Sequence, residues 1–257
     1  MKTPVIEFKH FGFQYNAQAE PTLHDINLTI YKGEKVLIVG PSGSGKSTIA
    51  NCMNGLVPFA YPGESTGILK IQDKEVKTQS VFELSKMVGT VLQDPDGQFI
   101  GLTVGEDIAF ALENDCIPYQ ELHDRVAQAA KSVGITDDLD SAPHQLSGGQ
   151  KQRVSIAGVI VDRVKILLFD EPLANLDPCA GKQAIDLIDE LHKKSNATIV
   201  IIEHRLEDVL YRDVDRVVLM NDGRVVADMP PNELLSSDLL MDYGIREPLY
   251  NWNDAYL

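Results

Sequence analysis

The sequence predicts an α/β fold with a mostly parallel central sheet, an antiparallel β subdomain at the N-terminus and an inserted helical subdomain. Residues 5–15 and 23–30 alternate apolar and polar side chains, which is typical of half-buried antiparallel strands. Other short apolar runs do not alternate, as expected of strands buried on both faces of a parallel sheet: 36–39, 88–92, 165–169 and 198–202. Stretches with helical spacing lie between these runs, so strands and helices alternate along the chain.

The helical stretches are recognised by apolar residues that recur every three or four positions. Residues 118–134 and 185–191 show this spacing. Near the C-terminus, two strand-like runs flank the turn Asn221-Asp222-Gly223, and residues 216–228 are therefore predicted to form a hairpin.

The composition is that of an ordinary globular protein with an excess of acidic residues. The 257 residues include 23 Lys and Arg against 38 Asp and Glu, a net charge of −15. This balance argues against a nucleic-acid partner, because phosphate backbones are held largely by cations. No apolar run approaches the ~20 residues of a membrane span, and no secretion signal is seen. We expect a cytosolic protein that reaches a membrane only through another subunit, with Cys52, Cys116 and Cys179 as reduced, packed thiols.

Residues 40–47 read Gly-Pro-Ser-Gly-Ser-Gly-Lys-Ser and fit the phosphate-binding pattern G-x₄-G-K-[ST]. They follow a buried strand and precede a predicted helix, which is the context this pattern requires. Backbone N–H groups and the helix N-terminus would hold phosphates, Lys46 would reach the β and γ phosphates, and Ser47 would offer a hydroxyl to Mg²⁺. The predicted nucleotide-binding residues of this segment are Gly40, Ser42, Gly43, Gly45, Lys46, Ser47 and Thr48. The alternative is a glycine-rich turn that binds nothing.

A second element is the apolar run 166–169, which ends in Asp170 and Glu171. This position would place Asp170 beside the Mg²⁺ held by Ser47. A second carboxylate in a dry phosphate site can orient or deprotonate a water, so Glu171 is predicted to act in hydrolysis. The alternative is a strand end that carries two solvated acids.

The run Leu146-Ser147-Gly148-Gly149-Gln150 resembles the signature motif of ABC-type ATPases. Other positions follow the same family in order. Gln93 ends a strand as the Q-loop glutamine does, Asn175-Leu176-Asp177 resembles the D-loop, and His204 follows a strand as the switch histidine does. The D-loop begins with Ala174, where many relatives have Ser or Thr.

Tyr15 stands where that family stacks an aromatic ring on adenine. Phe13 is nearby, and either ring could instead pack against the sheet. The resemblance covers residues 4–235 and implies a domain over 1–235, with a helical subdomain over about 94–161 and a tail over 236–257.

The resemblance also implies how the site works. Two cassettes would close head to tail on ATP and Mg²⁺, as a homodimer, a heterodimer or a fused longer chain. One chain would supply Lys46, Ser47, Gln93, Asp170, Glu171 and His204, and the facing one Ser147, Gly149 and Asp177. Among these, Glu171, His204, Gln93 and Lys46 would be catalytic, and Ser47, Gln93 and Asp170 would hold the metal.

A finer resemblance follows Gln93. Residues 94–99, 103–104, 106–110 and 203–208 look like the ATPases of energy-coupling factor (ECF) importers, which take up vitamins or cobalt and nickel ions. This implies a transmembrane coupling subunit docked on residues 96–110, a separate substrate-binding membrane subunit, and a peripheral position on the cytoplasmic face of the cell membrane. The alternative for this segment is an amphipathic part of the helical subdomain.

Other interpretations stay open at this stage. A soluble ABC ATPase acting in translation or DNA repair is the rival function, although such proteins usually carry two cassettes or a long coiled-coil insert. Residues 243–257 hold four aromatic rings, Tyr243, Tyr250, Trp252 and Tyr256. This tail could fold back on its own domain, act as a linker, or pack against a second cassette, and we favour the last.

Overall fold

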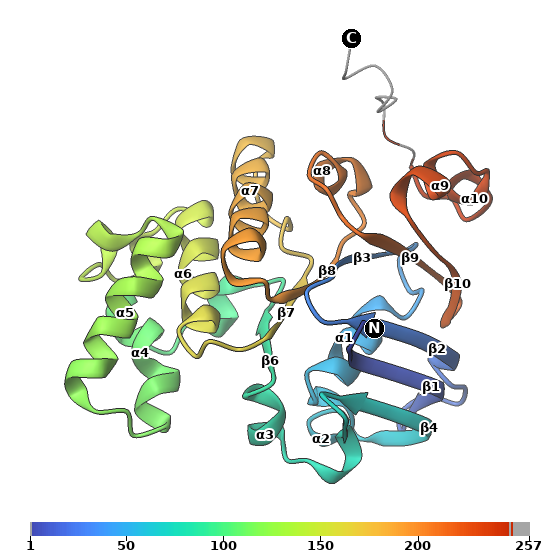
Figure 1. The fold of residues 1–257 in the computed structure, drawn as a ribbon, viewed down its shortest axis with the longest axis horizontal. Helices are drawn as coiled ribbons and strands as arrows, with labels where there is room; N and C mark the ends of the chain where they lie inside the picture. The colour runs from blue at the N-terminus through green and yellow to red at the C-terminus, as the bar shows by residue number, and fades with distance from the viewer. Residues whose placement is uncertain (1, 247, 249–257) are drawn as a thin grey trace.

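The computed structural model describes residues 2–246 and residue 248, and all structural statements concern these residues. Its strands form two sheets, and a group of helices stands apart from the N-terminal sheet (Figure 1). The N-terminal sheet is antiparallel, in the order β2-β1-β4-β5. Its strands are β1 (Pro4–Tyr15), β2 (Leu23–Tyr31), β4 (Gly63–Ile71) and β5 (Lys74–Glu75).

The central sheet has six strands in the order β10-β9-β3-β8-β7-β6, and only β10 is antiparallel to its neighbour. Its strands are β3 (Lys35–Val39), β6 (Val88–Val91), β7 (Ile166–Asp170), β8 (Thr198–Ile202), β9 (Arg216–Asn221) and β10 (Arg224–Met229). The predicted α/β class with a mostly parallel sheet is confirmed. The strand order also brings β6, β7, β8 and β3 side by side, so their carboxyl ends share one edge.

Both faces of the central sheet are covered, as its uninterrupted apolar strands predict. Leu37 and Val39 belong to the hydrophobic core on the side of the helices, whereas Val36 and Ile38 belong to the core shared with the N-terminal sheet. Successive strand residues point to opposite faces, so one apolar strand contributes to two cores.

The longer helices are α1 (Lys46–Met53), α4 (Val104–Asn114), α5 (Tyr119–Val133), α6 (Gly148–Ile160) and α7 (Pro178–Ser195). Shorter ones are α2 (Leu56–Phe59), α3 (Val81–Ser85), α8 (Leu206–Leu210), α9 (Pro231–Leu235) and α10 (Leu239–Asp242). Capping side chains define where several begin. Thr103 and Glu106 form a capping box at α4, and Ser147 and Gln150 form one at α6. No described helix is both long and apolar enough to cross a membrane.

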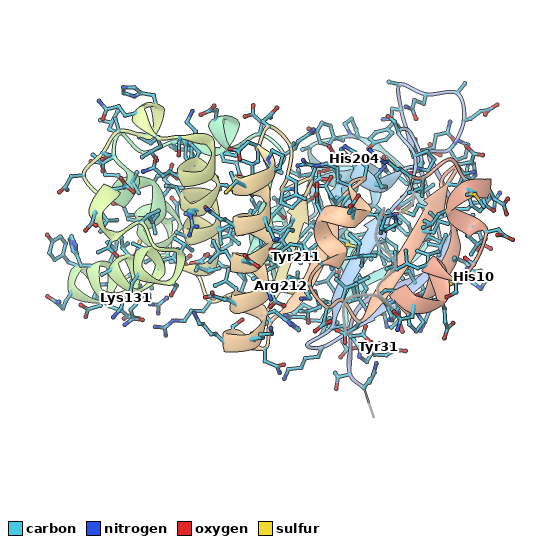
Figure 2. All side chains as sticks on the ribbon, turned by 90° about the horizontal axis from the view of Figure 1, so that it is seen from above. His10, Tyr31, Lys131, His204, Tyr211 and Arg212 are labelled. Atoms are coloured by element: carbon cyan, nitrogen blue, oxygen red, sulfur yellow. The ribbon has the colours of Figure 1, made fainter. Side chains whose placement is uncertain are left out.

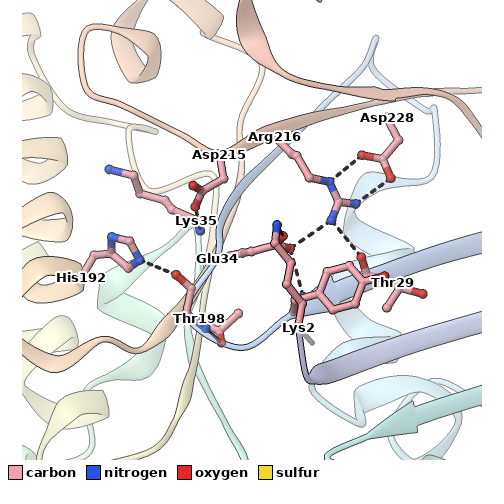
Figure 3. Close-up of polar contacts among 11 residues, drawn as sticks. Lys2, Thr29, Glu34, Lys35, His192, Thr198, Asp215, Arg216 and Asp228 are labelled. Atoms are coloured by element: carbon pink, nitrogen blue, oxygen red, sulfur yellow. Dashed lines mark hydrogen bonds and ion pairs between the residues drawn. The ribbon is translucent and has the colours of Figure 1, made fainter.

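Polar contacts join the elements at the end of the central sheet opposite the carboxyl strand ends (Figure 3). Arg216 makes two hydrogen bonds to the Asp228 carboxylate, at 2.8 and 2.6 Å, and one to Glu34 Oε2 at 3.0 Å. The buried Lys35 Nζ lies 2.5 Å from Asp189 Oδ1 on α7. These bonds attach the turn before β3 to the β9–β10 hairpin, and the start of β3 to α7.

On the helical side, the Tyr211 and Arg212 side chains contact α7 (Figure 2). The Tyr211 hydroxyl donates to Asp186 Oδ1 at 2.5 Å, and Arg212 Nε donates to the same oxygen at 2.7 Å. This cluster fixes α8 against α7, and thereby the loop that carries His204.

Two predictions about packing need correction or completion. Only Cys52 is a packed thiol, since Cys116 and Cys179 are exposed at the end of α4 and the start of α7. In the tail, Tyr243 packs against the core on the helical side, whereas Tyr250, Trp252 and Tyr256 lie outside the described residues.

Candidate nucleotide-binding and hydrolysis site

The glycine-rich segment forms a tight loop between β3 and α1. Gly43 and Gly45 have φ values of +80° and +96°, which L side chains rarely adopt. A Cβ on Gly40 would lie 2.3 Å from the Met220 carbonyl oxygen, so the neighbouring strand leaves no room for a side chain. The loop therefore needs glycine for both conformation and close approach.

The Lys46 side chain lies at the base of this loop, with 6% of the residue exposed. Its Nζ donates to the carbonyl oxygens of Gly40 at 2.8 Å and Pro41 at 2.9 Å. Burial lowers the pKa of Lys46, and the carboxylates of Glu171 and Asp170 oppose that effect. The ammonium group is thus held across the loop and close to the carboxylates of β7.

Asp170 ends β7 at the same edge of the sheet. Its Oδ1 is buried and has no hydrogen-bond partner among the described residues. Burial, and then the neighbouring Glu171, raises the pKa of Asp170 to about 6. Mg²⁺ prefers hard oxygen donors, and both the orphaned Asp170 carboxylate oxygen and the exposed Ser47 hydroxyl are donors of this kind, so the residues present fit this metal.

Three predicted catalytic residues meet at the next position. Glu171 has a φ of +49°, and its N–H donates to the Ile202 carbonyl at 2.9 Å, which anchors the turn to β8. Gln93 Nε2 donates to Glu171 Oε2 at 2.9 Å, and His204 Nδ1 lies 3.9 Å from that same oxygen. Figure 2 shows His204 on the other side of α7 from the helices α4 to α6. The structure therefore places Gln93 and His204 next to one group, the Glu171 carboxylate, with both beside its Oε2 atom.

Glu203, for which no separate role was predicted, is fully buried beside this group. Its Oε1 lies 3.3 Å from His204 Nδ1 and accepts a hydrogen bond from the His204 N–H at 3.0 Å. Its Oε2 accepts from the Leu173 N–H at 3.3 Å. Glu203 thus ties the His204 loop to the chain after Glu171. An acid directly after the apolar run 198–202 was the signal that could have found it.

Tyr15 lines the cleft from the end of β1. Its hydroxyl donates to Thr48 Oγ1 at 3.1 Å, and its ring meets Phe13 edge-on with centroids 4.8 Å apart. Phe13 is buried in the core, so of the two aromatic residues it is Tyr15 that borders the cleft.

A cleft of about 670 Å³ lies at this edge of the sheet, and the predicted site residues Gln93 and Asp170 are not among those that line it. Residues 40–43 and 45–48 make up its floor, and Tyr15, Glu171 and His204 line its sides. A second groove of about 350 Å³, between α5, α6 and α7, contains none of the predicted site residues. The cleft has the size typical of a small-molecule site and a floor built to hold phosphate.

Ser147, Gly149 and Asp177 do not line this cleft. Ser147 caps α6, and Asp177 caps α7 by accepting from the N–H groups of Cys179 and Ala180. The two caps are neighbours, because a Cβ on Gly149 would lie 3.6 Å from the Ala180 Cβ. The structure thus places Ser147, Gly149 and Asp177 together and apart from the residues that line the cleft.

A glycine-rich loop between strand and helix, together with the Asp170-Glu171 pair on the neighbouring strand ends, defines the P-loop ATPase class. Residues 23–174 match the model of the family described as ABC transporter, and the chain belongs to that family. The predicted resemblance to ABC-type ATPases is confirmed.

Relatives described as ABC transporter ATP-binding proteins align with most of this chain. It is 63% identical over 246 residues to the "Putative ABC transporter ATP-binding protein CPE1583" of Clostridium perfringens, covering 96% of this chain and 43% of the relative. A protein of Streptococcus mutans with the same description is 60% identical over 247 residues, covering 96% and 44%. The chain therefore spans less than half the length of these curated relatives.

Solved structures share the fold. The structure of cbiO1 from Clostridium perfringens, described as part of the ABC transporter complex cbiONQ, matches with a TM-score of 0.83 and 32% identity, covering 95% of this chain and 96% of that one. A dimeric post-hydrolysis state of the ATP-binding cassette MJ0796, bound to ADP and Pi, matches with a TM-score of 0.75 and 28% identity, covering 88% and 98%. The chain has the fold of an ABC ATPase.

Proposed function

We propose that this chain is the ATP-hydrolysing subunit of an ECF-type importer and that Glu171 orients or deprotonates the attacking water. The observation that carries the catalytic part is the Glu171 carboxylate, which accepts from Gln93 and lies beside His204 at the wall of the cleft. A carboxylate that faces a phosphate-binding loop across a cleft can activate water for attack on a γ-phosphate.

Each residue in or beside the cleft has a distinct task in this proposal. The N–H groups of residues 40–48 and the Lys46 ammonium hold the phosphates and stabilise the charge that grows in the transition state. Gln93 keeps Glu171 Oε2 directed toward the cleft, and Glu203 keeps the His204 ring in place. Ser47, Asp170 and Gln93 would hold Mg²⁺, which when bound neutralises phosphate charge. Tyr15 would pack against the adenine.

We further propose that Ser147, Gly149 and Asp177 complete the site of a second cassette. Their separation from the cleft of their own chain supports this, as does the dimeric state described for MJ0796. The second cassette is another copy, a different chain, or a further part of a longer protein.

Sedimentation of the Glu171→Gln variant tests this pairing, because blocked hydrolysis would preserve the ATP-bound state. We expect a dimer with Mg²⁺ and ATP and a monomer without nucleotide. Adding Ser147→Arg to that variant should abolish the dimer while ATP still binds. A monomer under all conditions, also with a candidate partner cassette present, would refute pairing through this surface.

The membrane assignment rests on resemblance. The structure described as part of cbiONQ supports a transmembrane coupling subunit and a substrate-binding membrane subunit, with this chain at the cytoplasmic face of the membrane and a vitamin or transition-metal ion as cargo. Purification of the tagged chain from detergent-solubilised membranes tests it. Recovery of membrane subunits supports the importer, and recovery of ribosomes or DNA instead would favour the soluble alternative.

A further inference from the structure

The C-terminal segment Gly244-Ile245-Arg246 forms part of the wall of the nucleotide cleft. It lines the same cavity as the glycine-rich loop (residues 40–47) and Tyr15, although about 200 residues of chain or more separate it from each of them. None of the family motifs discussed above includes this segment. Because its last residue is an arginine, the segment places a cation where the motif residues alone would not.

The segment is held in place by packing and by backbone hydrogen bonds. Ile245 is buried in the core on the helical side, next to the end of α10, where Leu240 is also buried. The Ile245 N–H donates to the Leu240 carbonyl at 2.8 Å, and Gly244 makes the turn with a φ of +66°. The chain therefore reaches the cleft at a defined point, and Arg246 follows directly after a buried anchor.

The charge of the cleft makes an added cation useful. Lys46 lies at its base, and the carboxylates of Asp170, Glu171 and Glu203 act on that lysine electrostatically. A nucleoside triphosphate would bring several further negative charges into this region. Arg246 is exposed and lines the cleft, so its guanidinium group lies where it can meet an anion bound there.

We propose that Arg246 binds the phosphate chain of the nucleotide from the C-terminal wall of the cleft. Residues 40–43 and 45–48 make most of that cavity a phosphate cradle, and a guanidinium matches phosphate oxygens with paired N–H donors. The inference rests on the ATPase function of the chain. It makes residues 244–246 a part of the nucleotide site.

Titration calorimetry on the full chain tests the proposal with two probes, ATP and inorganic tripolyphosphate, which lacks base and sugar. Arg246→Gln should weaken binding of both by about tenfold, the range expected for one exposed charged hydrogen-bonding contact. Arg246→Lys should recover part of the loss, because it keeps the charge but not the paired geometry. The defect should shrink in high salt, since screening weakens the charge.

Arg163→Gln is the matched control, because Arg163 is exposed in the turn before β7 and does not line the cleft. It should bind both probes like the parent chain. Equal ATP affinity in the parent chain and Arg246→Gln would overturn the proposal. So would a loss confined to ATP with tripolyphosphate unaffected, which would assign Arg246 to the base or sugar. A parent chain that binds neither probe would instead contradict the ATPase function itself.

Discussion

Gln93 donates a hydrogen bond of 2.9 Å from Nε2 to Oε2 of Glu171, which follows it by 78 residues. The two residues meet because β6 and β7 are adjacent parallel strands, with Val91 opposite Phe169, and both strands end at the same edge of the sheet. The amide therefore links the entrance of the helical subdomain to the carboxylate proposed to act on water. A movement of the segment around Gln93 would therefore directly displace the Glu171 carboxylate.

Replacing Glu171 by Gln should lower steady-state ATP hydrolysis about 10²- to 10⁴-fold, the usual effect of removing a general base. ATP binding should stay near normal, because Lys46 and the P-loop are unchanged. Hydrolysis and nucleotide titration on the assembled transporter measure the two effects. Glu190→Gln, at an exposed position on α7, is the control and should leave both unaltered. Near-normal turnover in Glu171→Gln would remove this residue from the mechanism.

Replacing Asp170 by Asn should stabilise the protein at high pH when metal is chelated. The ordinary Asp pKa is near 4 and that of folded Asp170 is about 6, so the folding free energy lost to ionisation grows between pH 4 and 6 and is complete above pH 6. We expect a gain of about 2–3 kcal/mol at pH 8 in urea unfolding, most of it absent at pH 4, where folded Asp170 is protonated and the unfolded carboxyl is only about half ionised. The exposed Asp137→Asn should show no such pH-dependent gain. An equal effect at both pH values would contradict this.

Replacing Leu102 by Ser should weaken attachment to the proposed membrane subunit while nucleotide binding is retained. In the segment after Gln93, Leu102 is 82% exposed and Ile100 66% exposed. Phe99 instead packs partly against the core, so a change there would also disturb folding. Pull-down of the coupling subunit measures attachment. Tyr119→Ser, at a ring that is 77% exposed on α5, is the control, and equal recovery with Leu102→Ser and the parent chain would exclude this docking surface.

Replacing Lys35 by Met should destabilise the domain by about 2–4 kcal/mol. Among the residues that the structure describes, it would leave the buried Asp189 carboxylate with the i,i+4 partner Lys193 alone, at 2.7 Å. The double change Lys35→Met, Asp189→Leu should recover much of the loss, because no uncompensated charge stays buried. Urea unfolding of the two variants and of Lys194→Met, whose partner Glu190 is exposed, measures this. A single Lys35→Met variant as stable as the parent would refute it.

Several parts of the fold were predictable because local chemistry leaves few options. The apolar runs without alternation became central strands, and Gly134 and Asn196 end α5 and α7 in the left-handed conformation. Strand β4 was missed because most of its side chains are exposed and show no apolar alternation. Its position depends on pairing with β1, which local pattern does not express.

Residue type and spacing suffice to predict the chemistry available to this chain: a loop with glycine where no side chain fits, a lysine and a serine after it, and an acid pair after an apolar strand. Which of these groups meet depends on the tertiary structure. Strand order brings Gln93 and His204 to Glu171, and Glu203 to His204, while it leaves Ser147 and Asp177 outside the cleft. Packing of Ile245 likewise decides that Arg246 reaches the cleft. The physical reason is that residue type and spacing act locally, whereas contacts between distant segments depend on which strands pair and which apolar surfaces are buried together.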